Sequence, residues 1–194
     1  SDLNPVYTTD GARLTFYSDR TGDYEIYVMN ADGSGLVQLT YSPGFDGHSS
    51  WSPDGGQIVF TSQRGGSYDL WIMNADGSSP YQLTSGLYAI YADWSPNGDR
   101  IAFSRTDDNG WLQVWKIRPS GLDLTLLMSK ADNWDAWGPS WSPDQKYISF
   151  TLTHWIWYQT QWAWNFSGVR VTSAAVGGVY ETPVGGETNW RSSW

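Results

Sequence analysis

The chain has 194 residues, of which 40% are apolar and only 16% charged, a balance that excludes a disordered tail, a coiled coil and a charged linker. Its net charge of −9 would repel a nucleic-acid backbone or an anionic membrane, and no apolar stretch is long enough for a membrane helix. Cysteine is absent, which excludes disulfides, thiolate metal sites and a thiolate nucleophile. We therefore expect one domain without a nucleic-acid partner and without membrane insertion.

Two strings of residues recur together along the chain with a period of roughly 45 residues, which indicates an internal repeat. The first string follows an aromatic residue each time and stands at 8–16, 52–60, 95–103 and 142–150, after Tyr7, Trp51, Trp94 and Trp141. The second string follows at 24–40, 68–84 and 112–128, with a decayed fourth copy at 159–173.

Each repeat predicts four short strands in the same order. The first strand holds the aromatic residue, the second holds an apolar pair such as Leu14 and Phe16, and the fourth ends the second string. Asp-Gly or Asn-Gly pairs separate the first strand from the second and the third from the fourth, because tight hairpins need the positive φ that glycine adopts freely. The third strand, as at 25–29, is apolar on both faces and must be covered on both sides.

Together these features predict an all-β fold, a β-propeller of four four-stranded antiparallel blades in a single domain. We expect the repeated Trp residues to pack neighbouring blades together and the Asp residues of the turns to serve backbone geometry. The end of the chain resembles the start of another unit and predicts a surplus C-terminal strand. The expected blades span about 4–47, 48–90, 91–137 and 138–186, with the extra strand at 187–194.

Four strings carry a resemblance to TolB-type, WD40-like β-propellers: Trp-Ser-Pro-Asp-Gly, Ile-x-Phe, Met-Asn-Ala-Asp-Gly-Ser and Gln-Leu-Thr, as at 51–55, 58–60, 73–78 and 82–84. The resemblance covers about residues 5–173, with a sharp departure after Thr151. It implies a bacterial protein outside the cytoplasm, periplasmic, secreted or at the cell surface. The repeat also occurs in prolyl-oligopeptidase-like enzymes, but their hydrolase domain and the N-terminal domain of TolB are not expected here, so neither role is expected to carry over.

Ligand binding is expected where the repeats differ, on the face that carries the loops after the second and fourth strands. These loops are predicted at 42–50, 85–93, 106–111, 129–140 and 154–161. They collect aromatic side chains, Phe45 among them, that suit stacking on sugar rings or the hot spots of a protein interface. The predicted ligand-binding residues are Tyr88, Tyr91, Trp111, Trp134, Trp137, Trp155, Trp157 and Tyr158.

The run at 154–164 admits two interpretations. Trp155 and Trp157 alternate onto one strand face, as Trp162 and Trp164 do on the next strand. They form either an aromatic platform for a glycan or a partner, or a cover for the outer flank of the last blade.

Catalysis is not predicted, because the chain has two His and no nucleophile elbow, zinc-protease motif or phosphate loop. Carboxylates in the predicted loops could converge on a cation such as calcium or serve a glycosidase or lyase, but such groups are more often solvated or cap turns. We therefore predict no cofactor and no required metal. The carboxylates concerned are Asp46, Asp93, Asp132, Asp135, Glu181 and Glu187.

The leading functional prediction is non-catalytic binding of a glycan or a protein partner through the aromatic loop face. A self-assembling structural propeller and a glycosidase or lyase are the alternatives. An open arc of four blades would expose apolar sheet faces, which predicts a homo-oligomer completed by the surplus strand or by the Trp-rich flank. The first residues lack a signal-peptide pattern, so we expect a mature chain or a piece of a longer one.

Overall fold

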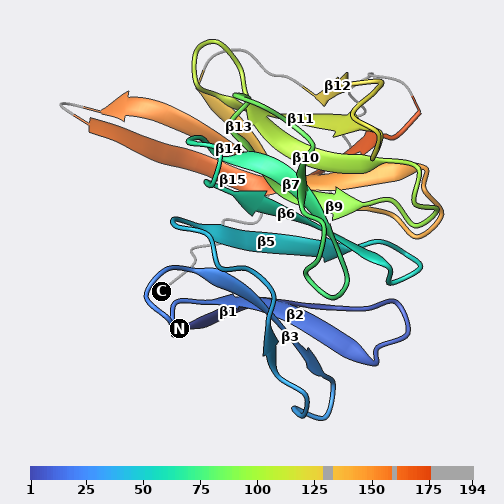
Figure 1. Cartoon of the computed structure of the whole chain (residues 1–194). Helices are drawn as coiled ribbons and strands as arrows, with labels where there is room; N and C mark the ends of the chain where they lie inside the picture. Colours follow the sequence, from blue (N-terminus) through green and yellow to red (C-terminus); the bar gives the residue numbers. More distant parts are fainter. Residues whose placement is uncertain (129–132, 159–160, 176–194) are drawn as a thin grey trace.

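The computed structural model describes residues 1–128, 133–158 and 161–175, and all regular elements within them are β-strands. They form four antiparallel sheets, from the blue sheet at the N-terminus to the orange one (Figure 1). The first three sheets have four strands each, and the fourth has three described strands. The strands are β1 (Asp2–Tyr7), β2 (Arg13–Ser18), β3 (Glu25–Asn30), β4 (Val37–Gln38), β5 (Asp46–Trp51), β6 (Gln57–Ser62), β7 (Asp69–Asn74), β8 (Tyr81–Gln82), β9 (Ala89–Trp94), β10 (Ile101–Thr106), β11 (Leu112–Ile117), β12 (Thr125–Met128), β13 (Trp134–Trp141), β14 (Tyr147–Tyr158) and β15 (Gln161–Ser173).

The sheets are arranged as the blades of a four-bladed β-propeller, which confirms the predicted fold. Within each sheet the strands are hydrogen-bonded in chain order, so that β1, β5, β9 and β13 are edge strands, which we call the inner strands. Each later inner strand contacts the preceding sheet: β5 packs against β1–β3, β9 against β5–β7, and β13 against β9–β11. The predicted fourth strand of the last blade and the surplus strand at 187–194 lie outside the described residues.

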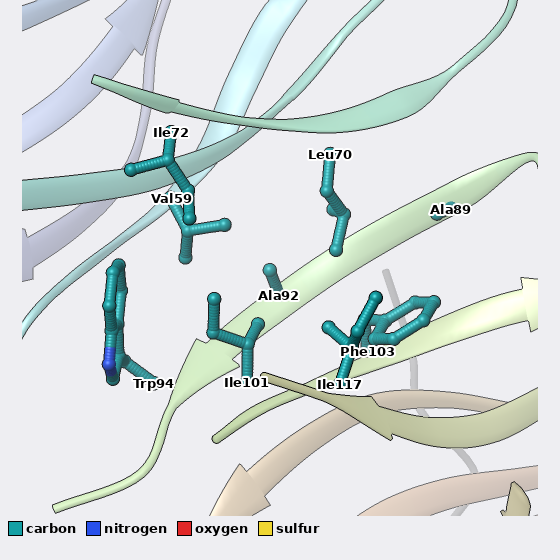
Figure 2. Close-up of a cluster of buried hydrophobic side chains, with 9 residues drawn as sticks. All are labelled: Val59, Leu70, Ile72, Ala89, Ala92, Trp94, Ile101, Phe103 and Ile117. Carbon is teal, nitrogen blue, oxygen red and sulfur yellow. The ribbon is translucent and has the colours of Figure 1, made fainter. Parts of the chain in front are cut away.

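Apolar side chains fill the space between neighbouring blades. Figure 2 shows nine of them between the second and third sheets, where Trp94 of β9 lies among residues such as Ile72 of β7. Trp94 is 7% exposed, and Trp51 is buried in the equivalent cluster one blade earlier. Trp141 is half-buried, and its Nε1 donates to the backbone oxygen of Asp93 in the preceding blade at 3.2 Å. The repeated Trp residues therefore pack the blades together, as predicted.

Asp-centred turns join the first and second strands of the blades, and they confirm the backbone role predicted for these Asp residues. In the second blade the Ser52 hydroxyl and the Gly56 N–H donate to Asp54 Oδ1 at 2.6 and 3.0 Å. Gly55 follows with a φ of 67°, which glycine adopts without steric cost. The fourth blade has Gln145 at this position, with a φ of 63°.

The inner strands begin earlier than predicted. β5 starts at Asp46, β9 at Ala89 and β13 at Trp134, and the added residues continue the ladder with the second strand, as Asp46 does opposite Ser62. Backbone groups can pair whatever the side chain, so neither the polar and glycine-containing composition of 46–50 nor the mixed composition of 89–93 shows that the segment continues the ladder. The predicted loops corrected in this way are 42–50, 85–93 and 129–140.

The prediction of a loop at 154–161 is wrong, because β14 and β15 form one long hairpin there. Trp155 lies opposite Trp164 in the ladder, and Trp157 lies opposite Trp162. Aromatic residues favour strands, which explains why this hairpin continues beyond the length of the other blades. The alternation of Trp residues along two adjacent strands was predicted and fits this register.

Two buried carboxyl groups meet where the first blade joins the second. Glu25 is 5% exposed and Asp46 is 1% exposed, and Arg64 donates to Asp46 Oδ2 at 2.6 Å. Burial, followed by the neighbouring Asp46, raises the pKa of Glu25 to about 7, although a hydrogen bond from Thr40 and the charge of Arg64 act in the opposite direction. Asp69, the counterpart of Glu25 in the second blade, instead accepts hydrogen bonds from two hydroxyls and two backbone N–H groups.

Candidate functional site

A cavity of about 200 Å³ lies where the four inner strands meet. Because every sheet contributes to its lining, it marks the axis of the propeller, and we call it the axial cavity. The described lining combines apolar, hydroxyl, amide and imidazole groups with one carboxylate. It includes Asn4 of β1, His48 and Ser50 of β5, Tyr91 and Asp93 of β9, and Ser140 of β13.

Each inner strand carries a bulge beside this cavity, where its pairing with the second strand shifts register. One residue at each bulge has a positive φ: 53° at Asn4, 48° at His48, 57° at Tyr91 and 63° at Gly138. This left-handed backbone is costly for residues other than glycine, so the surrounding sheets must hold it in place. Bulges re-aim side chains, and here they bring His48 and Tyr91 to the axial cavity.

Aromatic rings from all four blades form one connected cluster beside the axial cavity. The ring centroids of His48 and Tyr91 are 4.4 Å apart, Phe45 contacts His48 at 5.1 Å, and Trp137 contacts Tyr91 at 6.0 Å. Further ring contacts extend from Phe45 into the first three blades. This axial aromatic cluster consists of Tyr17, Tyr24, Phe45, His48, Tyr68, Tyr88, Tyr91 and Trp137.

Most rings of the cluster are half-buried and held by one another. Tyr17 meets Phe45 at an interplanar angle of 68°, and Tyr68 meets Tyr88 at the same angle, which is the edge-to-face geometry that aromatic pairs favour. Tyr88 is 45% exposed and Trp137 is 37% exposed. The cluster therefore has two exposed rings, those of Tyr88 and Trp137, which contact half-buried rings of the same cluster.

The structure brings only some of the predicted ligand-binding residues together. Trp134 stacks on His154, with ring centroids 4.2 Å apart, and Trp155 Nε1 donates to Asp135 Oδ2 at 2.7 Å. Trp111 is half-buried directly before β11. The side chains of Trp157 and Tyr158 lie outside the described part of the chain. The predicted residues that join the axial aromatic cluster are Tyr88, Tyr91 and Trp137.

Four members of the cluster were missed in the sequence, although the repeat contains a signal for most of them. Tyr24 and Tyr68 each stand directly before a third strand, at equivalent positions of the first two blades. A second signal is an aromatic or His residue three positions after an aromatic one, within the segment that starts each inner strand. This spacing recurs in the pairs Phe45 and His48, Tyr88 and Tyr91, and Trp134 and Trp137. The missed residues are Tyr17, Tyr24, His48 and Tyr68.

Burial keeps the imidazole of His48 uncharged at neutral pH. It lowers the pKa of His48 to about 4 and raises the pKa of Tyr91 above its usual value. It also raises the pKa of Asp93, which accepts hydrogen bonds from the Trp141 N–H at 2.8 Å and the Ser50 hydroxyl at 3.3 Å. Asp93 thereby ties three inner strands together at the axis.

The other carboxylates predicted in the loops do not assemble into a site within the described residues. Asp46 pairs with Arg64, and Asp135 accepts from the Leu112 N–H at 2.7 Å. The part of the chain that the structure describes contains no group of three or more His, Asp or Glu that could hold a metal ion. Asp93 is the one carboxylate in the described lining of the axial cavity. Outside the described residues lie Asp132, Glu181 and Glu187.

Comparison with known proteins gives a family match and several similar folds. The model of the TolB beta propeller domain matches residues 1–159. A TolB structure from Agrobacterium tumefaciens is 22% identical with a TM-score of 0.74, and the alignment covers 90% of this chain and 62% of that one. TolB from Acinetobacter baumannii is also 22% identical, with a TM-score of 0.70, over 89% of this chain and 43% of that one. A puromycin-hydrolyzing peptidase from Mycobacterium tuberculosis is 15% identical with a TM-score of 0.69, and the alignment covers 93% of this chain and 28% of that one.

Among curated proteins, the Tol-Pal system protein TolB of Geobacter sulfurreducens is 48% identical over 44 residues, which is 23% of this chain and 10% of that protein. The chain thus spans less than two thirds of the length of each of these relatives. In the described ranges there is no helix with the length and apolar character to cross a membrane.

Proposed function

The chain belongs to the TolB beta propeller domain family, and on that premise we propose that it is a non-catalytic binding protein that recognises a protein partner. The axial aromatic cluster carries this proposal, because rings from all four blades contact one another and two of them, His48 and Tyr91, line the axial cavity. Tyr and Trp residues most often dominate the binding energy of protein interfaces. The contacts among the rings hold them in place before the partner arrives, so little conformational entropy is lost on binding.

The axial cavity suits one side chain of a partner. Its volume of about 200 Å³ is below the roughly 300–1,000 Å³ of small-molecule pockets. A side chain inserted there would contact His48 and Tyr91, while the exposed rings of Tyr88 and Trp137 would contact the surrounding partner surface. We propose that this surface extends from Trp111 of the third blade along the fourth blade through Trp134, Trp155, Trp157 and Tyr158.

A glycan is the second candidate ligand, and the exposed rings of Tyr88 and Trp137 favour it. Sugar rings stack their apolar faces on aromatic side chains of this kind. The peptidase with a similar fold does not add catalysis to the proposal, because a shared fold does not transfer an activity. From the family resemblance we also propose that the protein acts outside the bacterial cytoplasm, in the periplasm, at the cell surface or after secretion.

We expect Trp137→Ala to weaken partner binding by about 1–3 kcal/mol while the melting temperature stays nearly unchanged. The ring is partly exposed and its loss removes a contact surface, not a core side chain. Peptides selected on the wild-type chain from a phage-displayed library provide the probes, and fluorescence anisotropy measures their Kd.

Tyr41→Ala is the matched control, since Tyr41 is 73% exposed and outside the axial aromatic cluster. Selected peptides that bind wild type and Trp137→Ala equally would contradict the proposed site. The same three proteins on a glycan array decide the second candidate, because sugar binding that depends on Trp137 would replace the protein partner as the conclusion.

We also propose that the chain forms a homo-oligomer, completed by the strand predicted at 187–194 or by the Trp-rich flank of the last blade. Size-exclusion chromatography with light scattering should give a mass above 21.8 kDa for the full chain. Deletion of 187–194 should lower that mass or the melting temperature. A monomer that the deletion leaves unchanged would rule out self-association.

A further inference from the structure

A second cavity, of about 470 Å³, opens between the third and fourth blades. It lies at the turns that join first and second strands, on the opposite face from the axial aromatic cluster. Its described lining is rich in cations and hydrogen-bonding groups, unlike the apolar clusters between the earlier blades. Among the lining residues are Arg100, Lys116, Trp141, Gln145, Lys146 and Tyr147.

Lys116 stands where the repeat otherwise places a buried apolar residue. It pairs with Ala102 across β10 and β11, as Ile72 pairs with Val59 one blade earlier. Ile72 is fully buried in the cluster that contacts the next blade, whereas Lys116 lines the cavity. Burial, and then the charge of Arg100, lowers the pKa of Lys116. The charged ammonium group therefore makes an unfavourable contribution to the free energy of folding.

Gln145 is a second departure from the repeat, and it lines the same cavity. The equivalent turn positions hold Gly11, Gly55 and Gly98, all with positive φ, and Gln145 adopts the same left-handed backbone at 63°. Glycine would remove that strain, so the amide side chain must serve something other than the turn. Two departures from the repeat, each unfavourable by itself, therefore meet at one cavity.

The described lining has a net positive charge, from Arg100, Lys116 and Lys146 against the one carboxylate of Asp99, whereas the whole chain is negative. Arg100, Lys116 and Lys146 are three of only 11 basic residues in a protein of net charge −9. Lys116 Nζ donates to the backbone oxygen of Ala174 at 2.5 Å, and an ammonium group has three protons to donate. The half-buried Arg100 lies 3.6 Å from a carboxylate oxygen of Asp123 and 4.0 Å from one of Asp99, and Lys146 lies 3.6 Å from Asp144. All three carboxylates are exposed, and ion pairs with solvent-exposed partners are weak and can give way to a better anion.

We propose that this cavity binds a small oxyanion, the phosphate or carboxylate group of a ligand, through Lys116 and Arg100. Lysine and arginine are the residues that bind such groups most strongly, because their hydrogen bonds to oxyanions are charge-assisted. The Gln145 amide and the Tyr147 hydroxyl supply neutral donors beside them. The site is separate from the proposed partner-binding surface and does not depend on it.

Calorimetric titration of the full chain with inorganic phosphate, and separately with succinate, tests the site at low ionic strength. We expect saturable binding of one anion per chain, with a Kd at least tenfold higher in Lys116→Ile and in Gln145→Gly. Each substitution installs the residue that the second blade carries, so both variants should melt at or above the wild-type temperature. Binding of phosphate alone, of succinate alone or of both supports the site and identifies its ligand group.

Arg13→Gln is the matched control. Arg13 occupies the position of Arg100 in the first blade, since the backbone oxygen of each accepts from the residue five positions earlier, and the second blade carries Gln57 there. The substitution removes one positive charge from the same face, and the anion Kd should stay within twofold of wild type. The proposal is overturned if neither anion binds, if Lys116→Ile binds as wild type does, or if Arg13→Gln weakens binding equally.

Discussion

The substitution Trp94→Ala is expected to lower the free energy of unfolding by about 3–5 kcal/mol. The indole lies in the apolar cluster between the second and third blades, which also contains Val59, Ile72 and Ile101 (Figure 2). Its removal leaves a cavity, because strands on both sides hold the neighbouring side chains apart. It also leaves the backbone oxygen of Gly98 without the hydrogen bond that Nε1 donates at 3.2 Å.

Urea denaturation followed by circular dichroism measures this loss. Tyr41→Ala serves as the control, because exposed substitutions usually change stability by less than about 0.5 kcal/mol. A Trp94→Ala variant as stable as wild type would show that the repeated Trp does not bear the packing between blades, and the alignment of the repeats would then be wrong.

Glu25→Gln is expected to stabilise the protein at pH 8 by about 3 kcal/mol. The folded-state pKa of Glu25 is about 7, above the ordinary value of 4.5, so the folded state binds this proton more tightly than the unfolded state. Stability is therefore present in full below pH 4.5 and is lost as the pH rises through 7. Glutamine carries no proton to lose, so the variant escapes this loss and its advantage grows from pH 4 to pH 8.

Urea midpoints of wild type and variant at pH 4, 6 and 8 measure the effect. Asp32→Asn provides the comparison, because Asp32 is exposed and hydrogen bonds from Ser34 lower its pKa. That substitution should not stabilise the protein at pH 8. If the advantage of Glu25→Gln is the same at pH 4 and pH 8, the buried carboxyl does not titrate as stated.

The fold was predictable because its signals are local and repeated. A turn such as that at Asp54 and Gly55 needs only neighbouring residues, and a strand apolar on both faces, such as β7, already requires a cover on each side. Four copies of the same pattern then leave few arrangements other than stacked blades.

The site was predicted only in part, because its geometry depends on contacts between blades. The side-chain alternation of β9 does not reveal that Tyr91 takes a left-handed backbone, since the bulge arises from pairing with β10. The ring of Tyr91 contacts His48 of the neighbouring blade, and no local sequence pattern predicts this contact. The long hairpin was predicted only in part: the alternation of Trp residues indicated two adjacent strands, but 154–161 was also assigned to a loop, because aromatic residues fit a loop platform as well as a strand.

The bulge that recurs in the inner strands keeps the backbone conformation constant while the residue type at the axis varies. The backbone is alike in all four copies, whereas the side chain at the left-handed position differs: an amide at Asn4, an imidazole at His48, a phenol at Tyr91 and none at Gly138. A single exchange at one of these positions alters one quarter of the axial surface and leaves in place the apolar clusters between blades, such as that around Trp94, because none of the four residues belongs to them. Duplication of one module has thus produced an asymmetric surface, on which each quarter can diverge on its own while the common frame is kept.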